Sequence, residues 1–345
     1  MRVVRTVYGA GLRLAVPIRR RESSDSPLLP PRGSNRSDAE ACLVSARELS
    51  ALRTAASLRA AVEAAVRALE IDPQYVAAWC ALAEFRAALL TRLVEAPEEG
   101  GPAAVAAAEE ALALEPGCAL ALGVRGFVRA VVERDVGLGL ADLDRSVRID
   151  PRYWTTRLMR GWALVAANRV VDAVVELRMA VDINPWATWC HGTLAQYLWF
   201  NGEAEAALSV AREAAASFPN VDSIQMALSQ VASSLGHHDQ AIAAGRHAME
   251  LARDTPNSHT SLASALAWAG RHDESLEVIH AIEAAGPTLP AAWLAPAWLG
   301  LGRRDRALEM VARARDQRAP HYFYTFFDPR LAALRSKMPS WPVAA

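Results

Sequence analysis

The sequence contains almost no lysine. Lys337 is the single lysine among 345 residues, and arginine supplies the rest of the basic side chains. The 37 basic and 38 acidic residues leave a formal net charge of −1, so the chain as a whole has no excess charge that would attract nucleic acid or an acidic membrane. Any binding of that kind must therefore come from a local cluster of charge.

Cysteine is also scarce. The four cysteines are far apart in the sequence and include no C-x-x-C pair: they are Cys42, Cys80, Cys118 and Cys190. This pattern argues against a structural zinc site and against a small disulfide framework. We expect buried, reduced thiols.

Long apolar runs are missing as well. No segment approaches the ~18 consecutive apolar residues that a membrane-spanning helix needs, and the N-terminus lacks the apolar region and cleavage site of a signal peptide. The sequence thus predicts a cytoplasmic protein that has no membrane partner.

Catalytic motifs are equally absent. The chain has no phosphate-binding G-x-x-x-x-G-K-[ST] loop, no H-E-x-x-H and no G-x-S-x-G. The segment "GHHDQA" does not make a metal site, because consecutive residues at a helix turn diverge, and Cys190 beside His191 is a poor catalytic pair for the same reason. We therefore expect no enzyme activity, no catalytic residue, no metal and no cofactor.

What the chain does contain is a repeat marked by proline. Five endings of the type "ALEIDP" are separated by 43, 35, 34 and 34 residues, a period typical of stacked helix pairs, and their prolines are Pro73, Pro116, Pro151, Pro185 and Pro219. Proline disfavours helical geometry in the residue before it, so each one predicts the end of a helix.

Small residues recur in register with these prolines, as close packing of antiparallel helices requires. Ten residues after the prolines lie Ala83, Gly126, Gly161, Ala195 and Ser229. Twelve residues before them lie Ala61, Ala104, Gly139, Ala173 and Ala207, and five before them lie Ala68, Ala111, Ser146, Ala180 and Ala214.

Tight turns containing Gly or Asn, such as "ANRVVDA", "NGEAEA" and "GRHDES", separate the two helices of each unit. The whole pattern resembles the tetratricopeptide repeat (TPR), most clearly in "RGWALVAANRVVDAVVELRMAVDINP". The resemblance implies an all-α protein, a right-handed α-solenoid of about eight helix pairs from Asp38 to Gln317. We assign residues 38–320 to this repeat domain and residues 321–345, with the aromatic stretch "HYFYTFF", to a C-terminal segment that covers the open end.

In such a solenoid the first helix of each unit lines a concave surface that receives a protein, a peptide or a small ligand. The family's pattern implies an aromatic cluster edged by amides on this surface, suited to an apolar anchor. Tight packing of the interior is the alternative explanation for the same aromatics. The candidate residues are Trp162, Trp189, Gln196, Trp199, Phe200 and Gln230.

The N-terminus differs from the rest. Residues 19–37 are rich in Arg, Ser and Pro, which predicts a disordered linker. Within residues 1–18, the side chains of "VRTVYGAGLRL" alternate in type along the chain on either side of a glycine-containing turn, a pattern typical of a β-hairpin. This stretch resembles the C-terminal wing of OmpR-type winged-helix DNA-binding domains. The resemblance implies DNA contacts by Arg5, Thr6, Tyr8, Gly9, Gly11 and Arg13.

A wing, a linker and TPR-like units in this order are similar to a class of bacterial transcriptional regulators. In that class a winged-helix domain binds DNA and the solenoid senses a ligand or partner in signal transduction. No recognition helix precedes Met1, so we expect that this chain does not bind DNA specifically on its own, whether through a start-site error or a real truncation. Two alternatives remain open: a self-standing TPR scaffold for protein–protein interaction, or the detached regulatory end of a TPR-containing cyclase or kinase.

Overall fold

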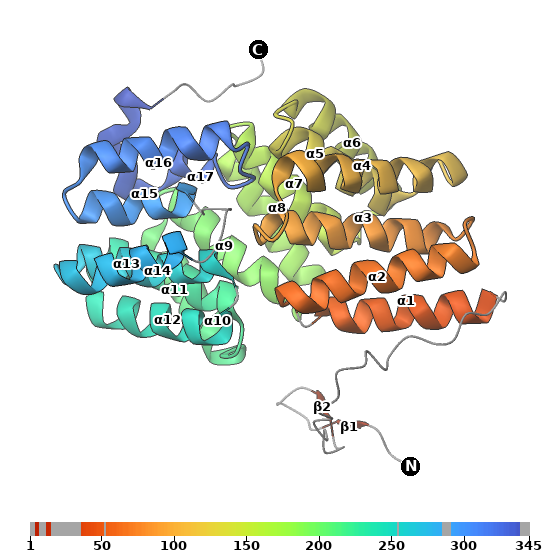
Figure 1. Ribbon diagram of the computed structural model, residues 1–345, viewed down its shortest axis with the longest axis horizontal. Helices are drawn as coiled ribbons and strands as arrows, with labels where there is room; N and C mark the ends of the chain where they lie inside the picture. Colours follow the sequence, from red (N-terminus) through yellow and green to blue (C-terminus); the bar gives the residue numbers. More distant parts are fainter. Residues whose placement is uncertain are drawn as a thin grey trace.

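A computed structural model describes residues 4–6, 12–14, 36–51, 53–253, 255–284 and 291–338. Over these residues sixteen α-helices form eight consecutive antiparallel pairs, which confirms the α-solenoid predicted from the repeat (Figure 1). The pairs are α1 (Arg36–Ala51) with α2 (Ala55–Ile71), α3 (Val76–Thr91) with α4 (Pro97–Leu114), α5 (Ala119–Val131) with α6 (Val136–Ile149), α7 (Trp154–Ala166) with α8 (Val170–Ile183), α9 (Thr188–Phe200) with α10 (Ala204–Ser217), α11 (Asp222–Ser234) with α12 (His238–Leu251), α13 (Pro256–Trp268) with α14 (His272–Ala284), and α15 (Ala291–Gly300) with α16 (Arg304–Asp316).

The prolines of the repeat lie just beyond the second helix of each unit. Asp72 is the C-cap of α2, and its extended backbone directs its N–H to the carbonyl of Ala68 before Pro73 turns the chain. A side chain six residues beyond the proline then bonds to the proline carbonyl: Trp79 Nε1 donates to Pro73 at 2.9 Å and Arg157 Nε donates to Pro151 at 2.8 Å. His191 and Gln225 make the equivalent contacts with Pro185 and Pro219. These four proline turns are thereby tied to the first helix of the next unit, whereas the Pro116 carbonyl accepts from Arg145 of α6.

The turns inside the last five units also follow the sequence. Asn168 (φ 59°) and the glycines of the four later turns adopt left-handed backbone geometry, which Gly and Asn accept more readily than other residues. Those glycines are Gly202, Gly236, Gly270 and Gly302.

The small-residue positions of the repeat are all buried between helices. Two helix backbones approach closely between α5 and α6, where a methyl group on Gly126 would lie 2.6 Å from the carbonyl oxygen of Gly139. Only a hydrogen atom fits at this crossing, which explains why glycine occupies both positions.

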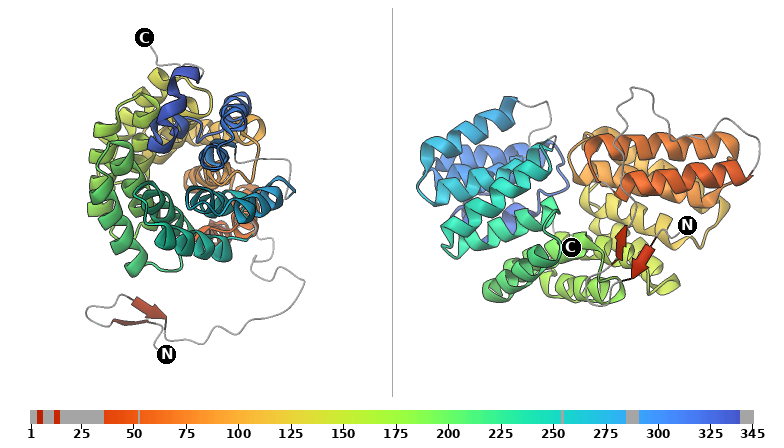
Figure 2. Two further views of the ribbon diagram at one scale, coloured as in Figure 1. Left: turned by 90° about the vertical axis from the view of Figure 1, so that its left-hand side faces the viewer. Right: turned by 90° about the horizontal axis from the view of Figure 1, so that it is seen from below.

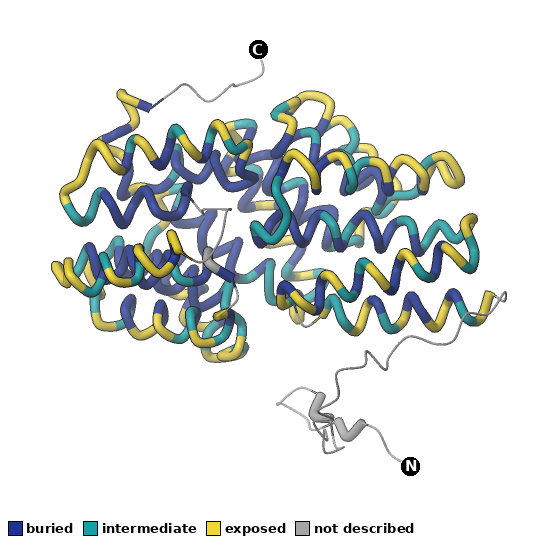
Figure 3. The backbone as a smooth tube through the Cα atoms, viewed as in Figure 1, coloured by how far each residue is buried: buried dark blue, intermediate teal, exposed yellow. Residues whose placement is uncertain are grey.

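The pairs stack into a superhelix that curves back toward its own beginning (Figure 2). Arg92 at the end of α3 pairs with Asp222 at the start of α11, at 2.9 Å. Arg134, after α5, donates to the carbonyl of Arg315 in α16 at 2.6 Å, across 181 residues. Buried residues are concentrated along the faces where the helices meet (Figure 3).

The chain continues after α16 into the short helix α17 (Tyr324–Phe327) and the 3₁₀ helix η1 (Pro329–Lys337). These elements pack on the last helix pair, and their aromatics also reach much earlier units. The Tyr324 ring lies 4.7 Å from Trp293 of α15 and 5.1 Å from Phe200 of α9, measured between ring centroids. Arg330 donates to Ser264 of α13 at 2.8 Å. The segment expected to cover the open end thus also occupies part of the concave side.

At the N-terminus, strand β1 (Val4–Thr6) pairs antiparallel with strand β2 (Leu12–Leu14), with Arg5 opposite Arg13 and Thr6 opposite Leu12. The other predicted wing contacts, Tyr8, Gly9 and Gly11, lie outside the described residues, as do residues 19–35 of the predicted linker. Among the described helices, none combines the length and the apolar run needed to cross a bilayer.

Candidate functional site

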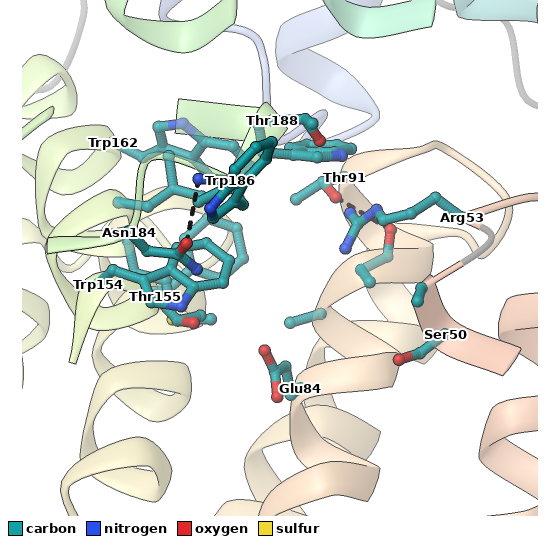
Figure 4. A pocket seen from close by; sticks show the side chains of 18 residues that line it. Ser50, Arg53, Glu84, Thr91, Trp154, Thr155, Trp162, Asn184, Trp186 and Thr188 are labelled. Atoms are coloured by element: carbon teal, nitrogen blue, oxygen red, sulfur yellow. Dashed lines mark hydrogen bonds between the residues drawn. The ribbon is translucent and has the colours of Figure 1, made fainter. Parts of the chain in front are cut away.

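A pocket of about 320 Å³ opens on the concave side of the superhelix, between the first two units and the fourth and fifth (Figure 4). We call it the tryptophan pocket, because four tryptophans line it: Trp154, Trp162, Trp186 and Trp189. Trp186 is 67% exposed, which is unusual for so large an apolar side chain and puts it at the rim. The cluster offers planar apolar surface to a ligand.

The opposite wall carries polar groups. Ser50 and Arg53 come from the end of α1 and the turn after it, and Glu84 comes from α3 (Figure 4). The guanidinium of Arg53 lies 4.0 Å from the ring centroid of Trp189, a cation–π contact that joins the two walls. The pocket therefore has an apolar side and a polar side.

Local backbone geometry holds Arg53 in place. Arg53 has a φ of 54°, and the next residue, Thr54, begins α2 with a reciprocal capping box in which Thr54 and Ser57 each accept from the other's backbone N–H. The rigid start of α2 thus fixes the turn that presents the guanidinium.

Burial shifts the pKa values of both charged groups of the polar wall. Desolvation lowers the pKa of Arg53 to about 10, so the guanidinium remains protonated at neutral pH. Desolvation also raises the pKa of Glu84, against the opposing effect of Arg53. Among the described residues the Glu84 carboxylate has no ion-pair partner. A ligand can find both a hydrogen-bond donor and an acceptor on this wall.

Two buried donors that line the pocket have no hydrogen-bond partner in the described part of the chain: Arg53 Nε and Trp162 Nε1. Buried donors are usually paired, so both are candidates to bind an acceptor on a ligand.

The six groove residues predicted from the sequence separate into two groups. Trp162 and Trp189 line the tryptophan pocket, with ring centroids 6.1 Å apart. The other four lie deeper along the concave side and are largely buried; they are Gln196, Trp199, Phe200 and Gln230.

Other side chains of the same molecule cover these four deeper residues. Gln196 Nε2 donates to Gln230 Oε1 at 2.7 Å, so the two amides satisfy one another. Trp199 is 2% exposed beneath Arg330, and Phe200 contacts Phe327 and Tyr324. These side chains make the contacts of a packed interior in this structure.

Four other residues of the pocket are not predicted from the repeat. Trp154 and Trp186 follow Pro151 and Pro185 closely, and that spacing could have placed them near Trp162 and Trp189. Arg53 and Glu84 belong to the first two units, and only the curvature of the superhelix brings them opposite the tryptophans.

Metal ligands are not gathered in the described residues, where no three His, Cys, Asp or Glu side chains converge on one point. The turn with His237, His238 and Asp239 opens α12 in the same way that other turns open their helices.

No protein-family model matches the sequence, and no curated protein is significantly similar to it. Similar folds exist among solved structures. A chain of the APC/C hetero-tetramer Cut9–Hcn1 matches 87% of this chain and 55% of its own length, at 14% identity and a TM-score of 0.60, so this chain spans about half of that structure.

Yeast Tom70 matches 90% of this chain and 68% of its own length, at 14% identity and a TM-score of 0.52. A thermophilic TPR protein of Thermus thermophilus matches 66% of this chain and 98% of its own, at 20% identity and a TM-score of 0.39. With the eight repeated helix pairs, the first two likenesses show that the chain has the fold of a TPR solenoid.

Proposed function

We propose that this chain is a TPR scaffold that binds a partner protein, and that the tryptophan pocket receives one large apolar or aromatic side chain of that partner. The observation that carries the proposal is the pocket itself, in which four tryptophans line one wall of a space of about 320 Å³ and one of them is 67% exposed. Deep pockets lined by aromatics are typical binding sites for an anchor residue.

The polar wall fits the backbone around such an anchor. A peptide carries an amide N–H and a carbonyl next to every side chain, and the pocket offers Glu84 as an acceptor and Arg53 as a donor opposite the rings. An apolar ligand without polar atoms would leave both charged groups desolvated and unpaired.

The C-terminal segment favours a short contact over an extended one. Tyr324 and Phe327 cover Phe200, and Arg330 covers Trp199, so these residues are already in contact with the chain's own side chains. A long peptide running along the whole concave side would have to displace this segment. A single inserted side chain would not.

A non-enzymatic role fits the same site. The charged groups of the pocket are one arginine and one glutamate, and no nucleophile paired with a base lies among its lining residues.

The proposal is tested by filling the pocket. Ala51 is exposed and lines the pocket at the end of α1, so Ala51→Trp places an indole there without disturbing the core. Ala41, also exposed on α1, does not line the pocket, so Ala41→Trp is the matched control. Peptides selected from a displayed random library on the unmodified chain are then titrated against both variants.

We expect the selected peptides to share a Trp, Phe, Tyr, Leu or Met residue. Their affinity for the Ala51→Trp variant should fall by roughly tenfold or more, equivalent to about 1.4 kcal/mol, whereas Ala41→Trp should bind as the unmodified chain does. Peptides that bind all three proteins equally would place the binding site elsewhere.

A second candidate is the sensor module of a winged-helix transcriptional regulator, with the solenoid shifting the populations of a DNA-binding and a non-binding state. This candidate rests on the wing resemblance, with which the antiparallel pairing of β1 and β2 is compatible. The regulatory end of a cyclase or kinase is the remaining alternative.

Gel-shift titration of this chain against the DNA upstream of its own gene tests its own part in DNA binding. We expect no sub-micromolar binding at physiological salt, since a wing alone supplies only weak phosphate contacts. Sub-micromolar binding that Arg5→Ala and Arg13→Ala weaken, and that unrelated DNA of the same length does not show, would instead assign sequence-specific DNA binding to this chain.

A further inference from the structure

Two cysteines far apart in the sequence meet between the second and third units. Cys80 lies on α3 and Cys118 is the N-cap of α5, and their Sγ atoms are 2.9 Å apart. A disulfide bond is about 2.05 Å long, so a small movement of the two side chains would join the sulfurs. Both cysteines are free in this structure.

The pair is accessible from one side. Both residues line an open groove of about 540 Å³, at the opposite end of α3 from the tryptophan pocket. Cys118 is partly exposed in this groove, whereas Cys80 is 5% exposed behind it. A small oxidant can therefore reach Cys118 first.

The surroundings of the two thiols differ. The hydrogen bond from Cys80 lowers the pKa of Cys118 to about 7, with help from the backbone N–H groups of Ala121 and Leu120 at the start of α5 and against the effect of burial. The same hydrogen bond, together with burial, raises the pKa of Cys80. At neutral pH Cys118 is thus the more nucleophilic of the two.

We propose that Cys80 and Cys118 form an oxidation site that closes to a disulfide on reaction with a peroxide. The Cys118 thiolate attacks one oxygen of hydrogen peroxide, the O–O bond breaks, and Cys118 becomes a sulfenic acid as hydroxide leaves. The Cys80 sulfur then attacks the Cys118 sulfur, the S–O bond breaks, and the hydroxide released combines with the Cys80 proton to form water. In sum, two thiols and one peroxide give one disulfide and two waters.

The disulfide would link two repeat units covalently. Cys80 stands one helical turn before Glu84, and α3 also supplies Ala87, Ala88 and Thr91 to the tryptophan pocket. Oxidation would hold this helix against α5 by a covalent bond in place of side-chain packing alone. The oxidation site does not depend on what the tryptophan pocket binds.

The test uses the full chain, first reduced and then treated with a stoichiometric amount of hydrogen peroxide. Differential alkylation and peptide mapping follow the state of each cysteine, and circular dichroism checks that every variant is folded. We expect one linked peptide pair that contains Cys80 and Cys118, two fewer alkylatable thiols, and full reversal by dithiothreitol. Cys42→Ser and Cys190→Ser are the matched controls, because both cysteines are fully buried and lie outside the groove.

The single variants of the pair distinguish the cysteine that reacts with the peroxide from the cysteine that then forms the disulfide. Cys80→Ser should leave a sulfenic acid on Cys118 that dimedone traps, whereas Cys118→Ser should leave Cys80 unmodified under the same treatment. The proposal is wrong if all four thiols stay alkylatable in the folded, unsubstituted chain, if Cys42 or Cys190 is oxidised in their place, or if Cys118 proceeds to sulfinic acid without forming the link.

Discussion

Arg92 Nη2 lies 2.9 Å from Asp222 Oδ2, and this ion pair joins the second unit of the solenoid to the sixth across 130 residues. Its side chains are 5% and 14% exposed. Asp222 also accepts from Ser258 at 2.8 Å, so the carboxylate is held from both sides where the superhelix curves back on itself.

Removal of the arginine should therefore destabilise the protein. Arg92→Ala leaves a carboxylate that is only 14% exposed without its cation, and we expect the free energy of unfolding to fall by about 3 kcal/mol in urea denaturation. Arg169→Ala is the matched control, because its pair with Asp172 is about half exposed and should contribute no more than about 0.5 kcal/mol. An equal loss of unfolding free energy in the two variants would show that the Arg92–Asp222 pair is no stronger than a surface pair.

Glycine at the α5–α6 crossing is a second testable feature. Gly126→Ala forces a methyl group to within 2.6 Å of a backbone oxygen, which cannot move aside as a side chain can. We expect a loss of about 1–3 kcal/mol in thermal denaturation. Gly117 has open space around its Cβ position, so Gly117→Ala should leave stability unchanged or slightly raised.

The burial of His321 predicts how the free energy of unfolding depends on pH. The ring is buried between Trp162 and Trp293, and burial lowers its pKa to about 4. Above the unfolded-state pKa of about 6.5 the ring is neutral in both states, and the folded state carries no penalty. As the pH falls from there toward 4, the unfolded chain takes up a proton that the folded chain does not.

The free energy of unfolding should accordingly fall by about 2 to 3 kcal/mol between pH 6.5 and pH 4.5 on account of His321 alone. Urea denaturation across this range measures the slope. His321→Phe should flatten it, whereas His272→Gln, at an exposed helix start, should leave it unchanged. A slope that is the same in all three proteins would mean that other groups cause it.

Substitution of two tryptophans distinguishes a role in packing from a role in binding. Trp199 is 2% exposed, and Trp199→Ala should cost about 3–5 kcal/mol of unfolding free energy. Trp186 is 67% exposed at the rim of the pocket, so Trp186→Ala should change stability by less than about 1 kcal/mol and still weaken binding of an anchored peptide. Chemical denaturation and peptide titration of the same two variants distinguish these effects.

Local signals made the helix pairs predictable. Proline after α2, α4, α6, α8 and α10, glycine in the later turns and small residues at the crossings each act within one unit or between neighbours. Their spacing predicts five of the helix pairs, and the TPR resemblance extends the number to about eight. The wing residues of the first eighteen positions rest on a resemblance, to which the structure adds only the pairing of β1 with β2.

The tryptophan pocket is less predictable because curvature builds it. Trp162 and Trp189 lie in neighbouring units and follow from the TPR resemblance, but Arg53 faces them only after several units have turned the chain around. The same curvature brings Tyr324 against Phe200, so how much of the concave side stays uncovered depends on a contact that no repeat pattern contains.

The contact between Arg134 and Arg315 also affects how the solenoid unfolds. A linear array of repeats can lose its end units one at a time, since each unit contacts only its neighbours. Here the third unit is tied to the eighth and the second to the sixth, so the ends cannot fray independently. The solenoid should unfold in one cooperative transition, and it should fold more slowly than an open array of the same length, because distant segments must meet before the ring is complete.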